Sequence, residues 1–118
     1  MKDNGDRSQP ELLVKWYDYT KWVLERVDSF PKNQRFVLGT RLADAVVLVM
    51  ELLGEAAYAG RVRKRELLEE VNRKIEVVRW LVRLVHDRKL IANRQFLFSA
   101  RALEECGRMA GGWCKSLA

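Results

Sequence analysis

The chain has 118 residues, of which 48% are hydrophobic and 32% charged, and its net charge is +6 with a pI near 9.6. This balance excludes an intrinsically disordered protein and suits one domain, which we assign to residues 1–118. The polar start of the chain lacks the apolar centre of a secretory signal, and no run of about 18 uncharged apolar residues occurs. We therefore expect a soluble, cytoplasmic protein in which residues 1–9 are flexible.

Helical periodicity predicts two helices in the first half of the chain. The first runs from about residue 10 to 28, where Ser8 and Glu11 have the spacing of a capping box. Its expected inner positions are Leu12, Leu13, Trp16, Thr20, Val23, Leu24 and Val27. The second helix contains residues 36–57 and ends near residue 60. Its expected core positions are Leu38, Leu42, Ala45, Val46, Val49, Leu53 and Ala56.

The second half predicts two further helices, from about residue 64 to 86 and from about residue 94 to 115. The third helix has a core stripe of Leu67, Leu68, Val71, Ile75, Val78, Val82 and Val85. The fourth has Phe96, Ser99, Leu103, Cys106, Ala110, Trp113 and Leu117. Because the links are short, consecutive helices should be antiparallel. The expected fold is an all-α, up-down-up-down four-helix bundle.

The second and third helices are apolar over a wider arc than a monomeric bundle needs. The surplus predicts a subunit interface at Val37, Val47, Leu48, Leu52, Tyr58, Val77, Trp80 and Leu84. The acidic strip of the second helix (Asp44, Glu51 and Glu55) could meet the basic strip of a neighbour's third helix. Such a heterologous contact can close into a ring. The alternative is a monomer with an unusually apolar surface.

No constellation of residues predicts catalysis. His86 is the single histidine, and its place near the end of the third helix favours a structural role. Cys106 and Cys114 are eight residues apart in one predicted helix, which is too far for a disulfide bond. Neither their spacing nor the single histidine suits zinc. We therefore expect a protein that is not an enzyme and that holds no metal or cofactor.

Basic residues form two clusters that could bind nucleic acid. One cluster is Arg61, Arg63, Lys64 and Arg65, and the other is Arg79, Arg83, Arg88, Lys89 and Arg94. On the first helix, Trp22 should lie on the outer face near Tyr19 and Arg26, where it could stack on bases or contact a protein partner. The alternative is a basic surface that is only solvated.

Four segments together have the pattern of a known family: KWYDYTKWVLERV, FPKNQRFVLGTRL, LLEEVNRKIEVVRWLVRLVHDRKLI and GRMAGGWCK. Over about residues 12–115 the chain resembles Avd, the accessory variability determinant of diversity-generating retroelements. Avd lies within a wider set of four-helix proteins that includes those encoded in ribosomal RNA intervening sequences. The second segment places Phe30, Pro31, Arg35, Phe36, Leu38, Gly39 and Arg41 at family positions, which should fix how the chain enters the second helix.

The resemblance implies a four-helix bundle that assembles into a barrel-shaped homopentamer with a basic surface. It implies partners as well: the reverse transcriptase of the retroelement and nucleic acid, either template RNA or its cDNA. The implied role is support of mutagenic retrohoming, with the chemistry supplied by the polymerase. Two alternatives stay open, a stand-alone RNA-binding protein and a scaffold for protein contacts only.

Overall fold

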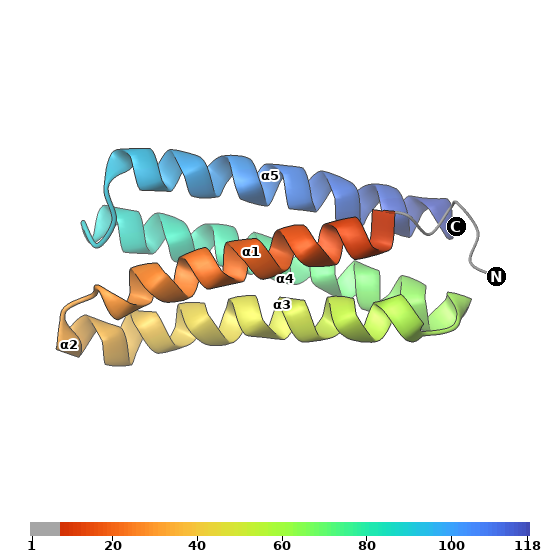
Figure 1. The fold of residues 1–118 in the computed structure, drawn as a ribbon, viewed down its shortest axis with the longest axis horizontal. Coiled ribbons are helices and arrows are strands. Elements are labelled where there is room, and N and C mark those ends of the chain that lie inside the picture. The colour runs from red at the N-terminus through yellow and green to blue at the C-terminus, as the bar shows by residue number, and fades with distance from the viewer. Residues whose placement is uncertain (1–7) are drawn as a thin grey trace.

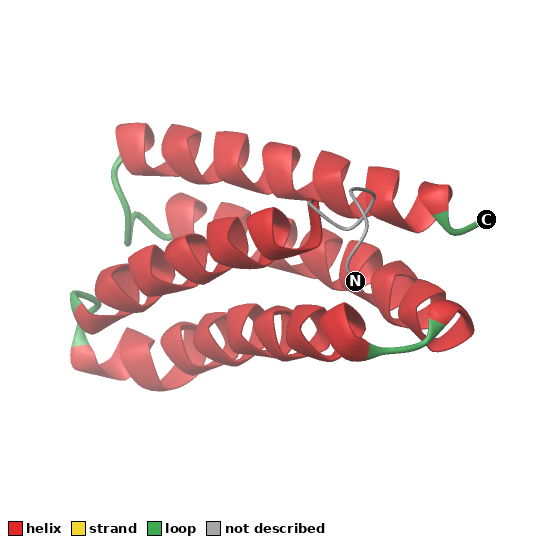
Figure 2. Cartoon of the chain, turned by 45° about the vertical axis from the view of Figure 1, so that its right-hand side comes forward, coloured by secondary structure: helices red, strands yellow, loops and turns green. Residues whose placement is uncertain are grey.

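The computed structural model describes residues 8–118, and within that range the chain is helical with no strand (Figures 1 and 2). The long helices are α1 (Ser8–Asp28), α3 (Thr40–Tyr58), α4 (Arg61–Asp87) and α5 (Asn93–Ser116). The expected all-α four-helix bundle is confirmed. The expected flexibility of residues 1–9 concerns residues 1–7, which lie outside the described residues, and residues 8 and 9, which belong to α1. The predicted capping side chain of Ser8 lies outside the described side chains.

The helices alternate in direction, and each lies beside two neighbours (Figure 1). Helix α1 packs against α3 and α5, and α4 packs against the same two helices. The bundle measures 48 × 23 × 21 Å between Cα atoms. One end, which we name the α4–α5 end, holds the turn between those helices (residues 88–92) and the α1–α3 connection (residues 29–39). The opposite α3–α4 end holds residues 59–60 and the end of α5.

A short bent segment connects α1 to α3. It consists of α2 (Lys32–Gln34) and the π-helical turn η2 (Arg35–Gly39), in which the N–H of Thr40 bonds to the carbonyl of Arg35. A Cβ on Gly39 would lie 2.9 Å from Cγ1 of Val27, so this close approach to α1 requires glycine. Helical backbone angles continue from α2 through η2 into α3, and the sequence did not predict the π-helical turn.

The core stripe predicted for α4 is confirmed at all seven positions, each of which is buried. In α1 the expectation for Leu24 is wrong, because this side chain is 38% exposed at the edge of the buried stripe. Tyr19 lies inside the stripe instead, with 3% of its surface exposed. The helix is therefore rotated slightly from the expected orientation, towards the side that carries Tyr19.

The polar groups in the core have partners. Trp16 donates from Nε1 to the carbonyl of Val46 at 2.9 Å, and this bond joins α1 to α3. The hydroxyls of Tyr19 and Ser99 lie 2.6 Å apart and join α1 to α5. Thr20 donates its hydroxyl to the carbonyl of Trp16 at 2.8 Å. These bonds satisfy groups that would otherwise be costly to bury.

Candidate nucleic-acid interface

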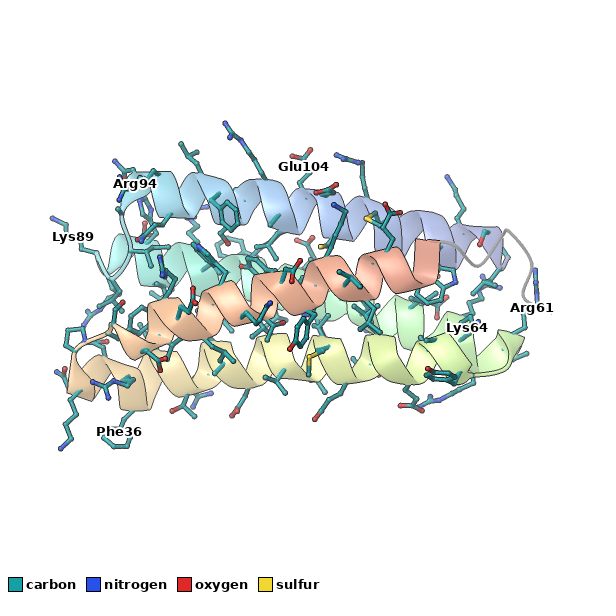
Figure 3. All side chains as sticks on the ribbon, viewed as in Figure 1. Phe36, Arg61, Lys64, Lys89, Arg94 and Glu104 are labelled. Carbon is teal, nitrogen blue, oxygen red and sulfur yellow. The ribbon has the colours of Figure 1, made fainter. Side chains whose placement is uncertain are left out.

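The turn between α4 and α5 exposes Arg88, Lys89 and Arg94. Lys89 and Arg94 extend from the same end of the bundle (Figure 3). None of the three forms an ion pair with another described residue. These side chains are therefore available to an anionic partner.

Lys89 has a backbone φ of 63°, the left-handed conformation that glycine usually adopts after a helix. Its N–H bonds to the carbonyl of His86 at 2.8 Å, and the N–H of Leu90 bonds to the carbonyl of Val85 at 3.0 Å. This pair of bonds is a Schellman motif that closes the end of α4. A lysine thus occupies a position where glycine would avoid a backbone cost of about 1–2 kcal/mol.

Arg79 and Arg83 line α4 behind this turn, and their surroundings differ. The guanidinium of Arg79 is bound within the protein: its Nε lies 3.0 Å from Glu76 Oε2, and its Nη2 donates to the carbonyl of Leu103 at 3.3 Å. Arg83 is exposed, with its guanidinium 5.5 Å from the centre of the Trp80 ring. Both line a hollow of about 280 Å³ between α4 and α5. Arg79 therefore also joins two helices, and Arg83 is the freer cation.

Two of the four members of the basic cluster at the α3–α4 end, Arg63 and Arg65, are neutralised within the chain. Arg63 pairs with Glu55 at 3.3 Å and with Glu66 at 3.4 Å. The hydrogen bond to Glu66, and secondarily the contacts with Glu55, raise the pKa of the Arg63 guanidinium. Arg65 pairs with Glu69 at 3.6 Å.

Two other cations belong to this cluster. Lys64 lies 5.7 Å above the ring of Trp113, and Arg61 is exposed. Figure 3 shows Arg61 and Lys64 at the end of the bundle opposite Lys89 and Arg94. The structure therefore divides the predicted basic residues between two ends. At the α3–α4 end Arg63 and Arg65 have carboxylate partners, whereas the three cations around the α4–α5 turn have none among the described residues.

The predicted surface around Trp22 is corrected by the structure. Tyr19 is buried, so its placement on the outer face is wrong. Trp22 is partly buried, with its ring 5.9 Å from Tyr19 and 4.9 Å from Phe98, and Arg26 lies 5.4 Å above it. Burial raises the pKa of the Tyr19 phenol, which stays neutral. This cluster packs α1 against α5 and offers no free ring face for a base.

The predicted interface residues are exposed with two exceptions. Leu52 is 8% exposed and belongs to the core, so its placement outside the core is wrong. Its position on α3 faces the other helices more directly than the sequence pattern indicated. Val47 is partly buried. The exposed members are Val37, Leu48, Tyr58, Val77, Trp80 and Leu84. Of these, Tyr58 is 93% exposed and Trp80 is 66% exposed.

Glu55, from the acidic strip that could contact a neighbour, already pairs with Arg63 of the same chain. The contact predicted between subunits would therefore compete with an ion pair that the single chain makes.

His86 has partners that fit a structural role. Its Nε2 lies 2.7 Å from Oδ1 of Asn93, and its ring stacks on Phe96 at 4.3 Å, so it links the two sides of the α4–α5 turn.

Cys106 is buried, Cys114 is partly buried, and both are free thiols. Among residues 8–118 no three His, Cys, Asp or Glu side chains are grouped to hold a metal ion. Over the same residues, no helix combines the length and apolarity needed to cross a membrane.

Comparison with known proteins places the chain in a family. A family model described as bAvd-like matches residues 12–117, almost the whole chain. No curated protein and no solved structure was found to match. The match covers α1 from residue 12 onwards, the other three long helices in full, and the turns that carry both basic clusters. The chain therefore belongs to the bAvd-like family, the Avd proteins of diversity-generating retroelements.

Proposed function

We propose that this protein is a non-catalytic accessory subunit that binds nucleic acid and the reverse transcriptase of its retroelement, and thereby supports mutagenic retrohoming in the cytoplasm. Family membership supports the retroelement role. The observation that carries the nucleic-acid part is the set of exposed cations at the α4–α5 turn, Arg88, Lys89 and Arg94, which have no carboxylate partner among the described residues.

Electrostatics gives this surface its expected behaviour. Lysine and arginine bind phosphates by charge and release counterions, so the affinity should depend strongly on salt and little on base sequence. Arg83 continues the basic surface along α4, whereas Arg79 contributes less because Glu76 lies 3.0 Å from its guanidinium. The template RNA and its cDNA are the nucleic acids that this role requires.

We also propose that the subunits assemble into a ring-shaped homopentamer. The exposed apolar side chains of α4 support it, since Val77, Trp80 and Leu84 share one helix face and large apolar patches on monomers are uncommon. A ring would repeat the cations of each α4–α5 turn and so multiply the phosphate contacts. Sedimentation of the purified chain should give five times the monomer mass, and a monomer at micromolar concentration would contradict this assembly.

The test of the function is co-purification with the reverse transcriptase of the proposed retroelement. The proposal expects the polymerase to remain bound after nuclease treatment and nucleic acid to bind without the polymerase. Arg88→Gln with Arg94→Gln should reduce nucleic-acid binding. The matched control at the other end, Arg61→Gln with Arg63→Gln, should leave it unchanged.

Each remaining result of the test contradicts a part of the proposal. Loss of the polymerase after nuclease would contradict direct binding and favour a stand-alone RNA-binding protein. Retention of the polymerase by a chain that binds no nucleic acid would favour a scaffold for protein contacts.

A further inference from the structure

Phe36 lies exposed on the π-helical turn η2, at the same end of the bundle as Lys89 and Arg94 (Figure 3). Its side chain is 70% exposed, and no other described ring or cation lies over it. The core does not use this phenylalanine, and its ring faces are free. An aromatic ring of this kind is the residue type on which bases of single-stranded nucleic acid stack.

The backbone accounts for the exposure. The π-helical turn buries Leu38 and Gly39, and the contact of Gly39 with Val27 holds that register. Phe36 and Val37 are consequently directed outwards, where they are 70% and 59% exposed. π-helical turns are frequent at functional sites, because the extra residue redirects neighbouring side chains.

Cations outnumber carboxylates at the end of the bundle that exposes Phe36, where Asp28 ends α1 and Asp87 ends α4. Residues 29–41 contain three cations and no carboxylate, and residues 88–101 contain four cations and no carboxylate. These are Lys32, Arg35, Arg41, Arg88, Lys89, Arg94 and Arg101. At the other end, residues 51–70 contain four cations and five carboxylates. The positive charge of the bundle is thus concentrated at the end that exposes Phe36.

We propose that the α4–α5 end of the bundle, together with α2 and η2, is a binding site for single-stranded nucleic acid, in which Phe36 stacks on a base. The cations of both connections bind the phosphates. This inference rests on the proposed nucleic-acid binding and adds its strand class and its base contact. Both connections lie within one cross-section of 23 × 21 Å, which a flexible strand can follow. In a duplex the bases are already stacked on one another, so only the terminal base pairs expose a face on which Phe36 could stack.

The test measures the affinity of purified variants for a short oligothymidylate by fluorescence anisotropy. Phe36→Ala should weaken binding about tenfold, the loss that follows from removing one base–aromatic stack. The matched control is Tyr17→Ala, which removes an aromatic side chain that is 50% exposed on α1 and should bind as the wild type does. Since both side chains are exposed, both variants should fold, which thermal unfolding would verify.

Two further probes separate stacking from charge. An abasic oligomer of the same length retains the phosphates and offers no base, so Phe36→Ala and the wild type should bind it equally. The affinity for a blunt-ended duplex should likewise change little in Phe36→Ala. An equal loss of affinity for all three probes would overturn the stacking role.

Three other outcomes would overturn this inference or the proposed function. Wild-type affinity of Phe36→Ala for oligothymidylate would overturn this inference and leave the proposed nucleic-acid binding intact. Failure of the wild type to bind any of the probes would overturn the proposed function itself. A lower assembly mass for Phe36→Ala, measured by sedimentation, would identify Phe36 as a subunit contact and overturn its role as a base contact.

Discussion

Replacement of Lys89 by glycine should make the protein more stable and weaken its binding to nucleic acid. Lys89 has a φ of 63° and closes α4 through the bonds from its own N–H to His86 and from Leu90 to Val85. Neither bond involves the lysine side chain, so glycine can retain both. The substitution thus separates the backbone requirement of the turn from the charge of the side chain.

The magnitude follows from two opposing terms. Relief of the left-handed conformation is worth about 1–2 kcal/mol, and the greater freedom of glycine in the unfolded chain costs about 0.4–1 kcal/mol. The net gain for Lys89→Gly is therefore between about 0 and 1.6 kcal/mol, with a midpoint of about 0.8 kcal/mol. A chain of 118 residues has an unfolding entropy of about 250 cal/mol/K, so the midpoint corresponds to a rise in Tm of about 3 °C.

Thermal unfolding and salt-dependent binding check both halves of this prediction. Lys89→Ala is the matched control, because it removes the charge and retains the Cβ that the left-handed conformation disfavours. It should leave the Tm near the wild-type value, while both variants lower the slope of log affinity against log salt by about 0.7 for a single strand. A Tm of Lys89→Gly below the wild-type value would refute the backbone argument. An unchanged salt slope would refute the role of Lys89 in phosphate binding.

Three other predictions concern the fold. Tyr19→Phe should lower the free energy of unfolding, measured in urea, by about 1–2 kcal/mol, because it leaves the buried Ser99 hydroxyl without its partner. The double variant Tyr19→Phe with Ser99→Ala should lose less stability than the sum of the two single variants, and additive losses would contradict a shared bond. Gly39→Ala should destabilise the protein by about 1–3 kcal/mol, because the added Cβ would lie 2.9 Å from Cγ1 of Val27. Gly54→Ala is the control: its Cβ would meet nothing within 4 Å, so it should stabilise the protein by about 0.5–1 kcal/mol. Equal effects of the two substitutions on Tm would exclude the steric explanation. Burial raises the pKa of the Cys106 thiol from 9.0 to about 11, so its stabilising contribution is complete below pH 9 and is lost as pH rises through 11. In Cys106→Ala the free energy of unfolding should therefore fall less steeply between pH 9 and 11 than in the wild type, and an unchanged fall would contradict the burial of the thiol.

The sequence predicted the fold class and most of the core because the apolar stripes of the long helices are regular. In α4 every inward position is occupied by leucine, isoleucine or valine, so the helical period alone identifies the buried face. In α1 the same reasoning misplaced Tyr19 and Leu24. Tyr19 has a polar group that can be buried only with a partner, and that partner, Ser99, is 80 residues away in the chain. A local pattern contains no information on such a bond.

The sequence predicted which residues of the candidate site are charged, but not which of these charges are exposed and free of ion pairs. Clusters of arginine and lysine are visible in the sequence, but ion pairing is not, so the neutralisation of Arg63 by Glu55 across the α3–α4 turn required the structure. The left-handed Lys89 was missed because the usual signal for that conformation is glycine. The exposure of Phe36 was missed because it depends on a π-helical turn, for which the sequence has no established signal.

The salt dependence of nucleic-acid binding by the wild-type protein tests the central claim most directly. Three phosphate contacts from each α4–α5 turn predict that log affinity for a single strand falls against log salt with a slope of about −2 or steeper, measured between about 50 and 200 mM salt. Substitution of Arg88 and Arg94 by glutamine should make the slope shallower by more than one. An affinity that does not change with salt, or a slope that these substitutions leave unchanged, would contradict the assignment of the α4–α5 end as the nucleic-acid interface.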